Sequence, residues 1–381
     1  MMNLCVNGAF VLIIFLGSKL IITSQATAFD VGQLSSTFTY GFQILMSLMQ
    51  LSMIFVMVTM AEESAHRINE VLHATPTIAN PGQPVTQVAD GSIDFDDVSF
   101  KYSKNAERQA LDSIDLHIKS GETIGIIGGT GSAKSTLVNL IARLYDATSG
   151  TVRVGGIDVR DYDLDVLRHQ VAMVLQKNVL FSGTIADNLR WGDANATDEE
   201  IREAAHLACA DEFVDGFPKG YDTWIEQGGS NVSGGQKQRL CIARALLRRP
   251  KILILDDSTS AVDTKTDAKI RAGLATYLPQ TTKIIIAQRI SSVQDADRII
   301  VMEGGRISQI GTHEELLETS DIYRETYTSQ NKMSEEAQEV EEAADETVAE
   351  MAQDAPAADQ TQVDKATTPQ DIDQKGGEAN E

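Results

Sequence analysis

Two long apolar stretches open the chain, and a different pattern of short apolar runs follows them. Residues 3–22 carry only Lys19 as a charge, and residues 40–60 carry none. Each stretch has about 20 residues, which as a helix is long enough to cross the roughly 30 Å hydrocarbon core of a bilayer. Residues 23–37 between them are mostly polar. The pattern predicts a two-helix transmembrane hairpin whose connecting loop lies outside the membrane.

The first stretch has a second interpretation, as a secretory signal. Residues 26–28 read Ala-Thr-Ala, which is similar to a cleavage site, but no basic residue precedes the apolar run, and this disfavours a signal. With either interpretation the second stretch delivers the remaining chain to the cytosolic side. Arg67, just after that stretch, fits the same placement.

Residues 91–329 alternate short β-branched runs with helical stretches. A zone containing three prolines, residues 75–84, separates this part from the helix that continues the second apolar stretch. Apolar runs this continuous are typical of strands buried on both faces, so we predict an α/β domain with a largely parallel sheet. The predicted strands are residues 93–100, 123–127, 171–175, 252–255, 283–287 and 298–302.

A glycine-rich loop follows the predicted strand at 123–127 and precedes a predicted helix at 137–145. In such a P-loop, backbone N–H groups and the helix N-terminus bind phosphate, while Lys134 adds charge and Ser135 can ligate Mg²⁺. Ala133 stands where the pattern has glycine, and its methyl group would strain the backbone or crowd the phosphate, at a cost of about 1–2 kcal/mol. A site that no longer binds nucleotide is the alternative. The predicted phosphate-binding residues are Gly128, Gly129, Thr130, Gly131, Ser132, Ala133, Lys134, Ser135 and Thr136.

Two later segments also carry polar chemistry. Ser233-Gly234-Gly235-Gln236 opens a predicted helix and can present N–H groups to a phosphate, or it is a simple helix cap. The apolar strand at 252–255 ends in two acids, Asp256 and Asp257. An acid at this end of a buried strand, beside a phosphate loop, is placed to hold Mg²⁺.

Together these segments resemble the signature motif, P-loop and Walker B strand of type IV ATP-binding cassette (ABC) exporters. The resemblance covers residues 1–329, with the cassette at 91–329. It implies ATP and Mg²⁺ as cofactors. Tyr102 would stack on the adenine, and Gln176 would contact Mg²⁺ and the attacking water. Metal ligands would be Ser135, Gln176 and Asp256, and the turn at residues 260–263 matches another cassette motif.

In that family two cassettes pair head to tail, so the resemblance also implies a partner chain. Ser233, Gly234, Gly235 and Gln236 would then complete an ATP site on the partner. The resulting fold class is an ABC-type P-loop nucleotide-binding domain with a helical subdomain, preceded by a two-helix transmembrane hairpin. The implied domains are residues 1–75, a linker at 76–90, the cassette at 91–329 and a tail at 330–381.

Two positions depart from the catalytic pattern of the family. Asp257 stands where the general base is Glu, and Gln288 stands where the family has its switch histidine. An Asp carboxylate ends about 1.3 Å short of a Glu carboxylate, and a misplacement of about 1 Å can cost 10²-fold in rate. Gln donates a hydrogen bond but carries no charge and relays no proton. Asp257, Gln288 and Gln176 are the predicted catalytic residues. The departures at Asp257 and Gln288 resemble the noncatalytic site of a heterodimeric exporter.

The composition indicates an acidic C-terminal tail and disfavours a nucleic-acid partner. Asp and Glu number 55 against 32 Lys and Arg, giving a net charge of −23, and residues 331–381 hold 15 of the acids with no aromatic residue. That segment cannot bury enough apolar surface to order itself, so we expect a disordered tail, either solubilising or partner-binding. The acidic balance disfavours nucleic-acid binding. Three scattered cysteines (Cys5, Cys209, Cys241) indicate a reducing compartment.

The function expected from the resemblance is that of an ATP-binding subunit of a heterodimeric exporter of a drug, lipid or peptide. The partners would be a second half-transporter and membrane lipid, in the plasma membrane with the cassette in the cytoplasm. The family has six spans before the cassette, and two are present here, so we expect either an N-terminally truncated product or a chain whose remaining spans are made elsewhere. The alternative is a truncated or regulatory nucleotide-binding membrane module without transport. Related DNA-repair ATPases are disfavoured because they insert a long coiled coil before the signature.

Overall fold

The structure, a computed structural model, describes residues 2–25, 27–257 and 262–332. The predicted acidic tail from residue 333 onward, and residues 260 and 261 of the cassette turn, lie outside the described residues. The chain divides into two compact units, Met1–Thr77 and Ile78–Glu381. Each unit is described by itself.

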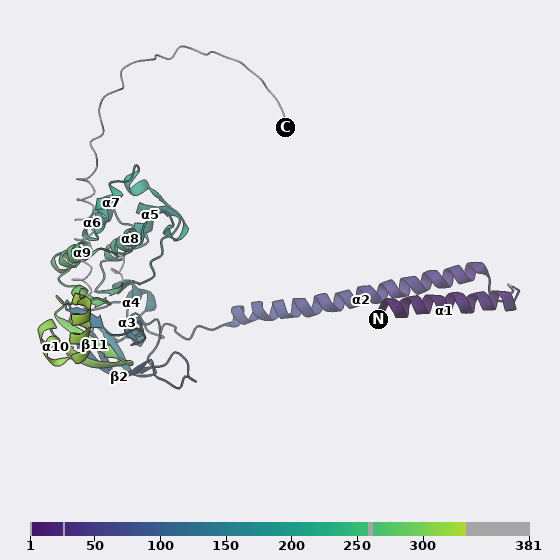
Figure 1. The fold of residues 1–381 in the computed structure, drawn as a ribbon, viewed down its shortest axis with the longest axis horizontal. Helices are drawn as coiled ribbons and strands as arrows, with labels where there is room; N and C mark the ends of the chain where they lie inside the picture. Colours follow the sequence, from purple (N-terminus) through teal and green to yellow (C-terminus); the bar gives the residue numbers. More distant parts are fainter. Residues whose placement is uncertain (1, 26, 258–261, 333–381) are drawn as a thin grey trace, which may run out of the picture. The chain divides into compact units, whose positions relative to one another are not determined.

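The first unit consists of two helices, α1 (Met2–Thr23) and α2 (Val31–His73), which lie side by side in Figure 1. Both are long and apolar enough to cross a membrane by length and composition, with their apolar side chains exposed. Phe10 and Phe38 pack across the pair with ring centroids 4.6 Å apart.

The connection between these helices is shorter than predicted, because α2 already begins at Val31 instead of after residue 37. The Asp30 side chain accepts from the Gln33 N–H, and the Gln33 side chain accepts from the Asp30 N–H. This reciprocal capping box satisfies two donors at the helix start and fixes it there.

The second unit is built on a six-stranded sheet in the order β12-β11-β3-β10-β9-β6. All neighbouring pairs in it are parallel except β11 with β12, which confirms the predicted largely parallel sheet. Every residue of β9 and β10 is buried, as expected for runs covered on both faces. The strands are β3 (Thr123–Ile127), β6 (Val171–Val174), β9 (Ile252–Asp256), β10 (Thr282–Ile286), β11 (Arg298–Glu303) and β12 (Arg306–Gly311).

A second, antiparallel sheet has the order β2-β1-β4-β5, and only its β1 was among the predicted strands. Its members are β1 (Ile93–Phe100), β2 (Leu111–Ile118), β4 (Ser149–Val154) and β5 (Ile157–Asp158). In β2 buried and exposed residues alternate through most of the strand, so its apolar positions do not form a continuous run. A small pair, β7 (Gly183–Thr184) with β8 (Trp224–Ile225), completes the strands that the structure describes.

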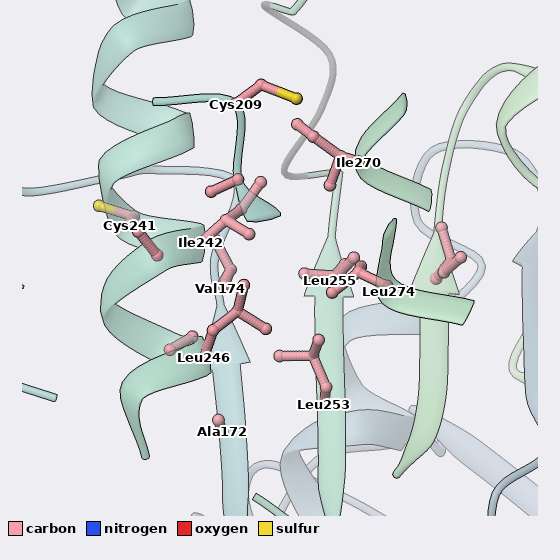
Figure 2. Packing of buried hydrophobic residues seen from close by; sticks show 14 of the residues in the cluster. Ala172, Val174, Cys209, Cys241, Ile242, Leu246, Leu253, Leu255, Ile270 and Leu274 are labelled. Atoms are coloured by element: carbon pink, nitrogen blue, oxygen red, sulfur yellow. The ribbon is translucent and has the colours of Figure 1, made fainter. Parts of the chain in front are cut away.

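Helices cover these sheets and divide the apolar interior into two cores. Figure 1 shows α5 to α8 gathered in one region, the helical subdomain. Figure 2 shows Ile242 and Leu246 of α8 near Val174 of β6 within one core. The other core packs Leu137 of α3 with Phe95 of β1. The helices are α3 (Lys134–Ile141), α4 (Leu164–Gln170), α5 (Ile185–Arg190), α6 (Asp198–Leu207), α7 (Asp211–Val214), α8 (Gly234–Leu247), α9 (Thr264–Tyr277) and α10 (His313–Thr319).

Two details of the helices matter for the site. The helix predicted at 137–145 instead begins at Lys134, directly after the glycine-rich loop, and ends at Ile141. A further helical segment follows α10 over residues 321–332, up to the end of the described chain. The described residues also include short 3-10 turns, namely η1 (Val159–Asp161), η2 (Gly220–Asp222), η3 (Gln227–Gly229) and η4 (Ile290–Ser292).

Candidate nucleotide-binding site

Most of the predicted site residues converge on the carboxyl edge of the parallel sheet. β10 lies between β3 and β9, with Ile286 paired to Ile126 on one side and to Asp256 on the other. The segments that follow these strands therefore emerge side by side. They are the glycine-rich loop, the acids Asp256 and Asp257, and the segment containing Gln288. Open α/β sheets bind ligands at this edge.

Lys134 lies over the glycine-rich loop at the start of α3. Its Nζ donates to the carbonyl oxygens of Gly128 at 2.7 Å and Gly129 at 3.0 Å, and to Ser132 Oγ at 3.3 Å. Partial burial lowers the pKa of Lys134, while the nearby carboxylates of Asp256 and Asp257 act in the opposite direction. The ammonium group thus places positive charge at the helix N-terminus, where backbone N–H groups also favour an anion.

Ala133 adopts the left-handed conformation that the missing glycine predicts, with φ 72° and ψ 24°. An L-residue in this region costs about 1–2 kcal/mol, because Cβ approaches the following carbonyl oxygen. At the other end of the loop, a Cβ on Gly128 would collide with the Met302 carbonyl oxygen of β11. The loop therefore keeps its close fit against the sheet and tolerates strain at Ala133.

Tyr102 lies beside α3, with much of its side chain exposed. Its hydroxyl shares a 2.9 Å hydrogen bond with Thr136 Oγ1, and its ring meets Phe100 and Tyr145 edge-on at centroid distances of 4.9 and 5.2 Å. The side chain is nevertheless 57% exposed. A purine base can stack on such an exposed ring, a contact worth about 1–3 kcal/mol.

Asp257 brings the three predicted catalytic residues together. Its Oδ2 accepts from Gln176 Nε2 at 3.0 Å and from Gln288 Nε2 at 2.9 Å. Burial raises the pKa of the Asp257 carboxyl and the charge of Asp256 raises it further, while the two amide donors and Lys134 act against this. The two glutamines lie 81 and 31 residues away in sequence. No local pattern predicts that both amides reach one oxygen.

The signature residues lie apart from this cluster. Ser233 caps α8: its side chain accepts from the Gln236 N–H, and the Gln236 side chain accepts from the Ser233 N–H. Ser233, Gly234 and Gly235 line a pocket with Val262 and Asp263, whereas Asp257 and Gln288 line a different one. Of the turn at 260–263, only Val262 and Asp263 belong to the described residues.

The oxygen donors of the predicted metal ligands fit Mg²⁺ better than a metal ion whose ligands all come from the protein. Within the described residues no group of three or more His, Cys, Asp or Glu is arranged to hold a metal ion. Ser135, Gln176 and Asp256 offer a hydroxyl, an amide and a carboxylate. Mg²⁺ commonly takes one or two such oxygen ligands together with waters and substrate phosphates. These residues would hold the ion only with a nucleotide present.

The family comparison agrees with this geometry. Residues 111–260 match the family model described as ABC transporter. The chain carries an ABC transporter ATP-binding domain. This confirms the predicted fold class, and the unit that contains this domain is called the ABC domain below.

Relatives that match a larger part of the chain are named as ATP-binding proteins as well. The chain is 42% identical over 330 residues to the uncharacterized ABC transporter ATP-binding protein YfiB of Bacillus subtilis, covering 87% of this chain and 56% of that protein. It is 45% identical over 241 residues to the putative multidrug export ATP-binding/permease protein YgaD of the same species, covering 63% and 41%. A third relative is the mitochondrial potassium channel ATP-binding subunit of Xenopus tropicalis, with 38% identity over 337 residues, 88% of this chain and 48% of that protein.

A solved structure of a bacterial Atm1-family ABC exporter with ATP bound superposes with a TM-score of 0.68. It shares 31% identity, and the match covers 86% of this chain and 57% of that one. The chain thus spans about half the length of the curated relatives it matches.

Two features of the ABC domain were not predicted. Phe181 and Trp191 stack at 4.5 Å with an interplanar angle of 20°, beside a pocket lined also by Leu175 and Val179. Nothing in the sequence linked the segment after Gln176 to Trp191.

The second unpredicted feature is Gln330, in the last described helix. Its side chain contacts the segment that carries Gln288. A glutamine in a polar helix near the start of an acidic tail carries no sequence signal for such a role.

Proposed function

We propose that this chain is the ATP-binding subunit of an ABC exporter and works as a pair with a second half-transporter. The observation that carries the proposal is the convergence of Lys134, Asp256 and Asp257 on one edge of the sheet. The exporter relatives and the two apolar helices support membrane transport as the setting. We place the chain in the cell membrane, with its ABC domain in the cytoplasm.

The finer proposal is that this chain's own ATP site hydrolyses slowly within a heterodimer. Asp257 is a methylene shorter than the Glu that the family has there, and its Oδ2 already accepts two amide hydrogen bonds. The shorter side chain places the carboxylate farther from the attacking water, and the two amide donors oppose the rise in its pKa that burial causes. The capped helix start at Ser233 would instead complete the partner's site, where a partner Glu would act. The cargo would be a drug, lipid or peptide, a class suggested by the multidrug export name of one relative.

Each residue then has a defined task. Lys134 and the loop N–H groups bind the phosphates, Tyr102 stacks on the base, and Ser135, Gln176 and Asp256 hold Mg²⁺. When bound, Mg²⁺ neutralises charge on the phosphates. The hydrogen bonds from Lys134 to Gly128 and Gly129 hold the loop in shape before nucleotide arrives.

We expect the purified chain in lipid to bind Mg-ATP and to release phosphate far more slowly than the ~10 s⁻¹ of a typical enzyme. Binding is measured with a fluorescent ATP analogue, and hydrolysis by phosphate release. Lys134→Ala is the control variant that should lose ATP binding, because it removes the only cation of the glycine-rich loop. Fast turnover by the unaltered chain, or no ATP binding, would contradict the proposal.

A second candidate is a regulatory nucleotide-binding module that transports nothing. It is favoured by Asp257 and Gln288, which both weaken hydrolysis while leaving the binding residues intact. Vesicles containing the chain and a candidate partner separate the two functions. ATP-driven uptake that depends on this chain supports the exporter, and ATP binding without uptake supports the module.

A further inference from the structure

The last described helix, residues 321–332, holds the segment after β10 through one side chain. Gln330 Oε1 accepts from the Ile290 N–H at 2.9 Å, and Gln330 Nε2 donates to the Gln288 carbonyl oxygen at 2.7 Å. The two bonded backbone groups belong to residues two apart, so one amide side chain bridges the segment around Arg289. The Gln330 side chain thus accepts one hydrogen bond with its amide oxygen and donates one from its amide nitrogen.

The same segment is hydrogen-bonded to Asp257, the carboxylate at the general-base position. The side chain of Gln288 donates to Asp257 Oδ2 at 2.9 Å, while its backbone carbonyl accepts from Gln330. On the other side, Ala287 N–H donates to the Ile126 carbonyl oxygen of β3 at 3.3 Å. The backbone at Gln288 is therefore held between the sheet and the terminal helix.

The helix has its own anchor, so the position of Gln330 is fixed. Tyr323 is fully buried, and its hydroxyl hydrogen-bonds His313 Nδ1 of α10 at 2.8 Å. The ring of Tyr327 meets His313 at a centroid distance of 5.3 Å. Tyr323, Tyr327 and Gln330 are spaced i, i+4 and i+7, which places them on one helix face. The tyrosines dock the helix, and Gln330 reaches the segment of Gln288.

We propose that Gln330 is a positioning residue that sets the place of Gln288 at the ATP site. The proposal rests on the proposed ATP-binding function and adds the terminal helix to its machinery. The competing interpretation is that Gln330 only helps to dock the helix. Gln330 is half-buried and lines an open pocket with Tyr327, Asp257 and Gln288. Water therefore replaces lost hydrogen bonds, and the fold survives its substitution.

The test compares three substitutions in the full chain in lipid. Gln330→Met keeps the length and loses both hydrogen bonds, whereas Gln330→Glu keeps the acceptor for Ile290 N–H and loses the donor for Gln288. Ser329→Ala, at the exposed neighbouring position, is the matched control. The readouts are backbone hydrogen exchange of residues 287–292, kcat for phosphate release and Kd for ATP, in the unaltered chain and in one carrying D257E and Q288H.

We expect Gln330→Met to speed exchange of that segment about tenfold and to lower kcat about tenfold, with Kd changed less than twofold. Gln330→Glu should lower kcat similarly while exchange at Ile290 stays slow. Loss of one positioning hydrogen bond accounts for effects of this size. Ser329→Ala should change nothing.

Unchanged exchange in Gln330→Met would overturn the proposal, as would a fall in kcat matched by an equal rise in Kd. If no variant binds ATP, the proposed function fails, and exchange of residues 287–292 alone decides whether Gln330 holds the segment.

Discussion

Ala133 is a residue whose local conformation disagrees with its chemistry. Its φ of 72° suits glycine, and it lies within the phosphate loop. We expect Ala133→Gly to raise the free energy of unfolding by about 1 kcal/mol and to tighten ATP binding severalfold, because glycine takes this conformation without strain. Denaturant unfolding and ATP titration measure the two effects.

Ala272→Gly is the control for that substitution. Ala272 is exposed within α9, where the helical backbone favours alanine, so this change should destabilise by about 1 kcal/mol. If both substitutions destabilise alike, the backbone at Ala133 is not strained.

Asp257 and Gln288 form a hydrogen-bonded pair, so their effects on hydrolysis should be coupled. We expect Asp257→Glu with Gln288→His to raise phosphate release more than either change alone, up to about 10²-fold, because base placement and contact with the γ-phosphate act on one transition state. Rates of the unaltered chain, both single variants and the double variant measure the coupling. A double variant no faster than the unaltered chain would point to Ala133 as limiting.

The sequence predicted which residue types gather at the site, but not how they bond. Lys134, Asp256 and Asp257 each follow or end a strongly apolar strand, and parallel strands bring such positions to one edge. The two amides on Asp257 Oδ2 and the reach of Gln330 depend on side-chain rotamers and on contacts between segments distant in sequence. Neither the rotamers nor these contacts produce a periodic pattern in the sequence.

At the scale of elements, continuous apolar runs were predicted well and alternating or short ones were not. β9 and β10 are buried throughout and lie within one residue of their predicted ends. β2 largely alternates, and β5 has two residues, so both were missed. The start of α2 had a readable signal, Asp30 with Gln33 three residues later, which the hydropathy pattern alone did not use.

Helix α8 allows a test of the proposed asymmetry between two ATP sites. If its N-terminus serves the partner's catalytic site, Ser233→Ala or Gly234→Asp should lower the ATPase rate of the assembled pair about 10²-fold, the scale of losing one transition-state donor. Asp257→Asn should lower it only a few-fold, because the ATP beside Asp257 turns over slowly. Steady-state ATPase of the co-purified pair in lipid gives the comparison.

Ser233 also caps its own helix, so the stability of each variant is the control. Loss of a serine cap costs about 1 kcal/mol, which leaves the chain folded. Equal losses of activity from the α8 and Asp257 variants would indicate two equivalent sites, and the asymmetric assignment would then be wrong.

At the scale of the whole molecule, a change of composition separates the two units. The apolar residues of α1 and α2 remain exposed in their unit, whereas those of the ABC domain fill two cores on either side of its main sheet. Hydropathy was sufficient to predict this contrast.

The stack of Phe181 and Trp191 has a practical consequence. The chain has two tryptophans, Trp191 and Trp224, with exposed fractions of 65% and 60%, at the end of α5 and in β8. Tyrosine, not tryptophan, stands at the proposed adenine position. Intrinsic emission from this protein therefore reports events at the helical subdomain rather than base stacking. A partner segment that covers Trp191 would shift the tryptophan emission to the blue even without nucleotide. Tryptophan emission can therefore report docking of a partner separately from ATP binding.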